Sequence, residues 1–333
     1  MVYSSYLDVG VLRDTLLPNL GFQLSLAVPT YLLGRSQNFF AAKDFLWSSG
    51  QVASAWYAAI GRHVLALPGI AGGGRGGGDV SFSTAVKAIT RPGWLLLAGA
   101  TLWGGRLLFR VIQQALNRGK DDPRYDDVKK DPQGWNKAFF TVYVPEAITQ
   151  ALITLPFTAP FRTSLPVIVP PSPTAKSYLQ FAAVGLFTTG FVLELLADYQ
   201  LAQHQEQKKM GMLREGVWSI VRHPNYLGDI LVHSSFPLLL YANNLFNPYT
   251  LLGPITNWFF LRHFSGDKEN EANQATRYQR ENPAKKAEFD QYRKEKNAVW
   301  PAVNELVTNR WSWIVLGAGA LGAVVERITA SLF

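Results

Sequence analysis

The chain contains no cysteine, and only 17% of its 333 residues are charged. The absence of cysteine excludes disulfide bonds, thiolate catalysis and metal sites built on sulfur. Soluble domains carry about 25% charged residues, so this charge content is low for a soluble protein. The mean hydropathy near zero conceals long apolar stretches that alternate with polar ones. This segregation predicts an all-α, polytopic integral membrane protein whose main surroundings are the lipid bilayer.

The apolar stretches predict about seven to eight transmembrane helices, because most approach the ~20 residues that cross a bilayer. The expected spans are 15–33, 52–70, 93–116, 138–160, 177–200, 228–243, 247–263 and 311–331. Arg62 and His63 interrupt the second span, and without it the count falls to seven. We expect three segments, which comprise N-terminal spans with a glycine-rich linker at Gly72–Gly78, a central membrane domain and a final helix. Their expected limits are 1–92, 93–301 and 302–333.

Basic residues gather in the loops rather than in the spans. The net charge is +8, but no Arg/Lys patch interleaves with aromatic residues as nucleic-acid binding would require. We therefore expect no nucleic-acid partner and attribute the charge to loops beside anionic lipid head groups. With eight spans, the charged loops 117–137, 201–227 and 264–310 share one side, which the positive-inside tendency assigns to the cytoplasm.

Two polar stripes fall inside expected spans. Arg106 and Arg110 are four residues apart and share a helical face, as do Glu194 and Asp198. An unpaired charge at this depth costs at least ~3 kcal/mol. We therefore expect the two stripes to face each other or a shared wet cavity. The alternative is an ion-pair network that only holds the helices together.

A polar octapeptide stands at the start of the sixth expected span. It begins at Arg222 and reads Arg-His-Pro-Asn-Tyr-Leu-Gly-Asp. Arg222 and His223 offer hydrogen-bond donors to an anion, and the amide of Asn225 suits an amide-bearing ring or a ribose hydroxyl. Asp229 shares the helical face of Asn225, and Gly228 permits close approach of a ligand or another helix. The pattern predicts a binding site at the membrane face.

The strongly polar stretch 265–297 is expected to form helix outside the membrane. Arg277 and Tyr292 are spaced to close over a bound nucleotide, and a solvated amphipathic helix is the alternative. His233 and His263 are interpreted as structural, because no His/carboxylate cluster suggests a metal site.

Three motifs resemble the steroid oxidoreductase superfamily, and in particular its uncharacterised membrane branch akin to the C-terminal domain of steroid 5α-reductases. They are Glu194-x-x-x-Asp198, Gly216-x-Trp218 and Arg222-His223-Pro224-Asn225-Tyr226-x-Gly228-Asp229. The resemblance covers roughly residues 100–301 and implies NADPH-dependent reduction of a double bond in a lipid or steroid-like molecule. It implies a membrane of the endoplasmic reticulum by default, with a mitochondrial membrane as the alternative, and it identifies no protein partner. The implied cofactor-binding residues are Arg106, Arg110, Glu194, Asp198, Arg222, His223, Asn225, Tyr226, Asp229, Arg277, Tyr278 and Tyr292.

Two departures separate this chain from the steroid 5α-reductases that it resembles. Glu194 stands where those enzymes have an amide, so a neighbouring arginine must offset its charge. Those enzymes also use a tyrosine near the stripe on the third span, where this chain has Trp103 and two glycines. The general acid is therefore not assigned by the resemblance, and Tyr143 and Glu146 on the next span are substitute candidates.

Two other functions remain open. Isoprenylcysteine carboxyl methyltransferases share the Arg-His-Pro-x-Tyr-x-Gly core and use S-adenosylmethionine, whereas Asn225 and Asp229 favour the reductase. A non-catalytic membrane or lipid-binding relative is the third possibility.

Overall fold

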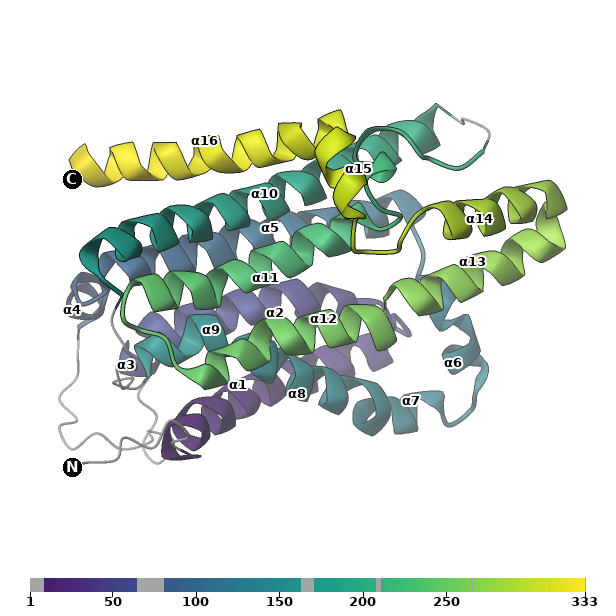
Figure 1. Ribbon diagram of the computed structural model, residues 1–333. Coiled ribbons are helices and arrows are strands. Elements are labelled where there is room, and N and C mark those ends of the chain that lie inside the picture. The colour runs from purple at the N-terminus through teal and green to yellow at the C-terminus, as the bar shows by residue number, and fades with distance from the viewer. Residues whose placement is uncertain (1–8, 65–80, 163–170, 208–210, 265, 333) are drawn as a thin grey trace. The chain divides into compact units, whose positions relative to one another are not determined.

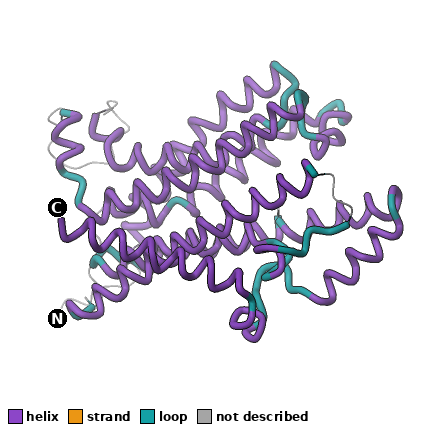
Figure 2. The backbone as a smooth tube through the Cα atoms, turned by 90° about the horizontal axis from the view of Figure 1, so that it is seen from above, coloured by secondary structure: helices purple, strands orange, loops and turns teal. Residues whose placement is uncertain are grey.

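The computed structural model describes residues 9–64, 81–162, 171–207, 211–264 and 266–332. Every regular element in these ranges is a helix, as the ribbon in Figure 1 and the tube in Figure 2 show. The predicted all-α fold is confirmed. The predicted glycine-rich linker, Gly72–Gly78, lies outside the described residues.

The helices pack into two compact units. Unit 1 consists of Met1–Pro170 and Asn244–Gly253, and unit 2 consists of Pro171–Asn243 and Pro254–Phe333. This division follows the packing of the helices, so the three segments expected from the sequence stay a prediction.

Unit 1 is built on α1 (Val9–Ser36), α2 (Ala42–Trp56), α5 (Arg91–Arg118) and α8 (Val144–Ile153). Helix α2 packs against both α1 and α5, and α1 also packs against α8. The shorter elements are η1 (Tyr57–Gly61), α3 (Arg62–Val64), α4 (Phe82–Lys87), η2 (Pro123–Tyr125), α6 (Asp126–Lys130), α7 (Gly134–Ala138), η3 (Phe139–Tyr143), α9 (Leu155–Thr158), η4 (Ala159–Phe161) and η6 (Pro248–Leu251).

Local sequence sets the limits of α5. The hydroxyl of Thr90 accepts a hydrogen bond from the backbone nitrogen of Gly93, which caps the first turn. The helix ends at Arg118, and the following Gly119 has a left-handed φ of 61°, which favours glycine.

A sharp bend interrupts the span around α8. The stretch Gly134–Ile153 meets Leu155–Phe161 at 57°. Pro156 lies in the first turn of α9 and cannot donate a backbone hydrogen bond, which accounts for a break at this point.

Unit 2 is built on α10, which packs against α11 and α16 (Figure 1). Its helices are α10 (Pro173–Glu206), α11 (Pro224–Ala242), most of α12 (Leu252–His263), α13 (Asp267–Glu281), α14 (Pro283–Glu295), α15 (Val303–Thr308) and α16 (Arg310–Leu332), with the short turn η5 (Gly216–Ser219). Helix α16 approaches α10 closely through glycine, since a Cβ at Gly319 would fall 2.6 Å from the carbonyl oxygen of Gly185.

Among the described residues, four helices are long and apolar enough to cross a membrane, and the bent pair around α8 makes a fifth. They are Leu12–Ser36, Arg91–Arg118, Pro173–Glu206, Arg310–Leu332 and Gly134–Ile153 with Leu155–Phe161. These long apolar helices indicate an integral membrane protein.

The predicted count of seven to eight spans is not confirmed. Helix α12 has 12 residues, or about 18 Å, which is shorter than the hydrocarbon core of a bilayer. Helix α11 carries Asn225, Asp229 and His233, whose polar side chains lower its hydropathy. The expected span 52–70 corresponds to the end of α2, then η1 and α3, while its last six residues lie outside the described part.

Candidate functional site

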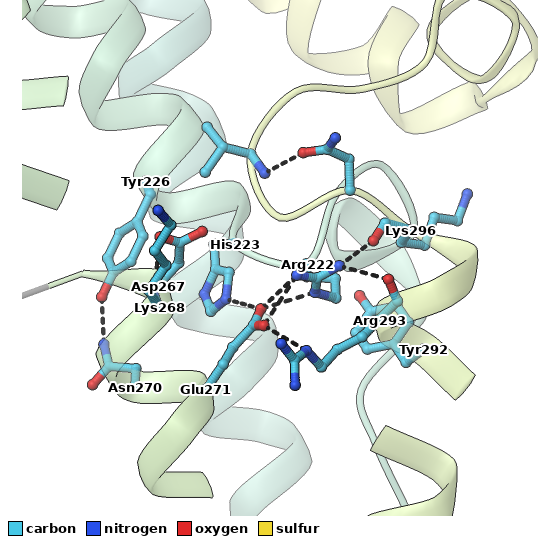
Figure 3. Close-up of polar contacts among 12 residues, drawn as sticks. Arg222, His223, Tyr226, Asp267, Lys268, Asn270, Glu271, Tyr292, Arg293 and Lys296 are labelled. Atoms are coloured by element: carbon cyan, nitrogen blue, oxygen red, sulfur yellow. Dashed lines mark hydrogen bonds and ion pairs between the residues drawn. The ribbon is translucent and has the colours of Figure 1, made fainter. Parts of the chain in front are cut away.

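A buried carboxylate on α13 binds the first two residues of the octapeptide. Arg222 donates from Nε to Oε1 of Glu271 at 2.8 Å and from Nη2 to Oε2 at 3.0 Å. His223 Nε2 lies 2.8 Å from Oε1, and Arg293 Nε lies 3.0 Å from Oε2 (Figure 3). Glu271 is only 4% exposed. We call Arg222, His223, Glu271 and Arg293 the Glu271 clamp.

The clamp keeps Glu271 ionised. Burial alone would raise the pKa of this carboxyl group, but hydrogen bonds from His223 and Arg222 and the positive charge of Arg222 hold it at about 2. An ionised carboxylate can only accept hydrogen bonds, so Nε2 of His223 must carry the proton in their contact. The clamp therefore fixes the imidazole tautomer as well as its position.

Backbone contacts hold the same end of the octapeptide. The backbone nitrogens of Arg222 and His223 donate to the carbonyl oxygens of Asn297 and Ala298 at 3.0 and 2.8 Å. The guanidinium of Arg222 also donates to the carbonyl oxygens of Arg293 and Lys296. The segment after α14 is thus joined to the start of α11 by both backbone and side chain.

An aromatic contact continues from the clamp into α11. Pro224 occupies the first helical position, which leaves His223 outside the helix with a φ of −127°. The imidazole stacks on Tyr226 with ring centroids 5.2 Å apart. The hydroxyl of Tyr226 accepts a hydrogen bond from Asn270 Nδ2 at 2.6 Å. Helix α13 therefore holds α11 at two neighbouring points.

Asn225 and Asp229 lie one helical turn apart and have different environments. Asp229 Oδ2 accepts a hydrogen bond from Asn257 Nδ2 on α12 at 3.2 Å, and Oδ1 lies 3.6 Å from Nε2 of the fully buried His233. Oδ1 of Asn225 is buried and has no hydrogen-bond partner among the described residues. A buried acceptor without a partner is rare in folded proteins, which marks Asn225 as a candidate ligand contact.

Gly228 serves helix packing. A Cβ at this position would fall 2.6 Å from both the carbonyl oxygen of Gly190 and Cγ of Glu194 on α10. Of the two uses expected for Gly228, the structure supports approach of another helix. Glu194 is only 2% exposed at this crossing, and Asp198 lies one turn further along α10.

The other residues predicted to contact a nucleotide lie on the polar helices α13 and α14, and they are Arg277, Tyr278 and Tyr292. The guanidinium of Arg277 lies 5.2 Å from the ring centroid of Tyr278, which itself packs edge-on against Phe289. The buried Tyr292 donates a hydrogen bond to the carbonyl oxygen of Trp218 at 2.7 Å, and burial raises the pKa of its hydroxyl. Tyr278 and Tyr292 therefore pack within unit 2, while Arg277 is exposed.

The remaining predicted residues belong to unit 1. Arg106 and Arg110 are half-buried on α5, in a different unit from Glu194 and Asp198, and the expected pairing of the two stripes stays a prediction. Glu146 Oε1 accepts a hydrogen bond from Lys43 Nζ at 2.6 Å. Tyr143 is 1% exposed, and its hydroxyl has no hydrogen-bond partner among the described residues.

Sequence reasoning did not select several residues that complete these contacts. Lys43 lies outside every expected span, and the spacing of Glu271 in the stretch 265–297 indicates a helical face without identifying its partners. Asn257 and Arg293 belong to none of the motifs recognised in the sequence. Only the polarity of Asn257 within an expected span offered a signal, since polar groups in spans usually have partners.

The sequence pattern of one protein family matches most of the chain. The DUF1295 family, described as a protein of unknown function, matches residues 77–296, which include α5, α10, α11 and the whole Glu271 clamp. Comparisons with curated proteins and with solved structures gave no match. On the extent of the match, the chain belongs to the DUF1295 family.

Proposed function

We propose that this protein is a membrane reductase that uses NADPH to saturate a carbon–carbon double bond of a lipid or steroid-like substrate. The observation that carries the proposal is the buried, unpartnered amide oxygen of Asn225, one residue beyond Pro224 and directly after the Glu271 clamp. A carboxamide is complementary to the carboxamide of a nicotinamide ring, because each group offers both a donor and an acceptor. The resemblance of the octapeptide to the steroid oxidoreductase motif supports the same assignment.

Residues of unit 2 fit the proposed cofactor in distinct roles. Asn225 would hold the nicotinamide carboxamide, and Asp229, tied to Asn257, would fix the helical turn that presents it. Arg277 is exposed and would bind phosphate. When bound, NADPH supplies the hydride, while the protein supplies orientation and electrostatics.

In this proposal Arg222 and His223 have a positioning role. Their donors bind Glu271 rather than facing solvent, so they hold α13 against α11 instead of contacting phosphate directly. Tyr143 and Glu146 stay candidates for the general acid, and the buried Tyr143 hydroxyl is a proton carrier of the required kind. We place the protein in the endoplasmic reticulum, with a mitochondrial membrane as the alternative.

A binding experiment tests this proposal. The full chain in lipid nanodiscs is titrated with NADPH, NADH and S-adenosylmethionine while tryptophan fluorescence is followed. We expect saturable NADPH binding that is lost in Asn225→Ala. The matched control is Asn243→Ala, since Asn243 lies at the opposite end of α11 and donates to Gln180 and Leu239. Binding of S-adenosylmethionine alone would instead favour a methyltransferase, and binding of none of the three would refute both enzyme functions.

A further inference from the structure

The interior of unit 1 contains a set of polar side chains between helices that pack against one another. Helices α1 and α2 each pack against the other and against α8 and α9. Every member of the set is at most 1% exposed. We call it the polar column, and its members are Thr15, Asn19, Gln23, Ser48, Gln51, Ser54, Gln150, Thr154 and Thr158.

Hydrogen bonds fix the orientation of the Asn19 amide. Nδ2 of Asn19 donates to Oγ1 of Thr154 at 3.3 Å and to Oγ1 of Thr158 at 2.6 Å. Both threonine hydroxyls donate their own proton to a backbone carbonyl oxygen, so they can only accept from Asn19. The other amide atom of Asn19 is therefore an oxygen, and it is buried without a hydrogen-bond partner among the described residues.

The same reasoning applies to Gln23. Its Nε2 donates to the carbonyl oxygen of Gly50 at 3.1 Å and to Oγ of Ser54 at 2.9 Å. A carbonyl only accepts, so the remaining atom of the amide is an oxygen. Oε1 of Gln23 and Oε1 of Gln150 are both buried without partners in the described part of the chain.

These two oxygens both lie close to Gly50. A Cβ at Gly50 would fall 2.9 Å from Oε1 of Gln23 and 3.0 Å from Oε1 of Gln150. Next along α2, Gln51 is 1% exposed, and neither atom of its amide has a partner among the described residues. Oγ of Ser48 is also buried without a hydrogen-bond partner among the described residues. Roughly 90% of buried polar groups in folded proteins have a partner, so such a concentration points to a bound ligand.

The chemistry of the column restricts that ligand. Its unpartnered atoms are mostly oxygens that accept hydrogen bonds, so the ligand must donate them. The column contains no carboxylate to neutralise an ion, and its burial requires a small molecule. The break between α8 and α9 falls at Thr154. Irregular backbone at membrane depth is tolerated where it is buried in protein or lines a water-filled cavity.

We propose that the polar column is a binding site for internal water, which donates hydrogen bonds to Gln23 and Gln150 and bridges Gln51 to its neighbours. Helices α1 and α2 precede residues 77–296, which match the DUF1295 family. The proposed water site is thus built largely outside the family match and is independent of the proposed reductase function.

The sign of a stability change tests this assignment. Gln51→Met keeps the size of the side chain but cannot bond to water. If water bridges the amide, the Tm of the full chain in nanodiscs falls by several degrees, because the water loses a partner. If the amide were unpaired in the folded protein, its removal would leave the Tm unchanged or raise it, and the proposal would be wrong. Gln113→Met, at an exposed position of α5, controls for the general effect of the exchange.

A second measurement does not depend on the folding of that variant. Short X-ray pulses generate hydroxyl radicals from water in place, and mass spectrometry locates the oxidised side chains. Leu46 Cδ1 would lie 3.3 Å from a Cβ at Gly50, so we expect Leu46 to be oxidised, and less so in Gly50→Ala. Leu97, which is 0% exposed in α5, is the dry control. Oxidation of Leu46 at the rate of Leu97 would contradict bound water. A Tm that rises with Na⁺ or K⁺ relative to choline, and only when Gln51 is present, would overturn water in favour of a cation.

Discussion

Replacing Glu271 by glutamine should release the hairpin of α13 and α14 from α11. The pKa of Glu271 is depressed from 4.5 to about 2, and at 1.36 kcal/mol per unit this corresponds to about 3 kcal/mol of preference for the ionised form. Because the clamp lies beside the solvated hairpin, water screens part of this interaction, and we expect a loss of about 2 kcal/mol. The variant leaves the guanidinium groups of Arg222 and Arg293 without their buried counter-charge.

Hydrogen exchange of the full chain in nanodiscs measures this loss locally. A change of 2 kcal/mol should speed exchange of the α13 backbone amides by roughly 30-fold. The matched control is Asp290→Asn on α14, since Asp290 is half-exposed and pairs with Lys286 one turn away. Such surface pairs contribute about 0.3–0.5 kcal/mol. Equal exchange rates in the two variants would refute the view that the clamp holds the hairpin.

Three further predictions concern Glu271, Gly228 and Lys43. The contribution of Glu271 to stability should be nearly complete above pH 4.5 and should be lost as the pH falls through about 2, because the folded-state pKa is depressed. The Tm difference between wild type and Glu271→Gln, measured from pH 7 to 2.5, should therefore shrink steeply below pH 4.5, and a constant difference would contradict the assignment. Gly228→Ala should lower thermal stability by about 1–3 kcal/mol through its clash with α10, whereas Gly317→Ala, with no atom within 4 Å of the added methyl group, should not; equal Tm values would oppose the packing role. Lys43→Met should destabilise unit 1 by about 3 kcal/mol, since it removes the cation that pairs with the largely buried Glu146, whose side chain is 14% exposed. A denaturation midpoint equal to wild type would disprove the importance of that pair.

The long helices of this fold were predictable from sequence because their apolar runs are continuous. Helices α1, α5, α10 and α16 coincide with expected spans at 15–33, 93–116, 177–200 and 311–331. Helix α2 was not located correctly, because Ser48, Gln51 and Ser54 face the interior of unit 1 rather than lipid. A hydropathy pattern does not distinguish an inward polar face from a break in a span.

The octapeptide was recognisable from its sequence, but its partners were not. Glu271 lies 49 residues from Arg222, in a stretch where carboxylates alternate with basic residues and no periodicity separates one from another. Arg222 and His223 both donate to the carboxylate of Glu271, and a contact of either residue with a cofactor stays a prediction. That the carboxylate belongs to the same chain depends on how α13 folds back, which a local pattern does not encode.

Gly228 illustrates the same limit on a smaller scale. Its sequence context allowed either a ligand or a helix to approach, and only the position of Gly190 and Glu194 on α10 decides between them. For Asn225, the sequence does not show whether the side-chain oxygen has a hydrogen-bond partner. The positions of the surrounding described residues show that it is buried without one among them.

The most direct test of the proposed function is transfer of isotope from cofactor to lipid. Membranes that contain the protein are incubated with NADPH deuterated at C4 and with their own lipids, and the lipids are analysed by mass spectrometry. The reductase proposal predicts deuterium at a newly saturated carbon, dependent on the protein and lost in Asn225→Ala but not in Asn243→Ala. Lipids that gain no deuterium under these conditions, while gaining a labelled methyl group from S-adenosylmethionine, would contradict it.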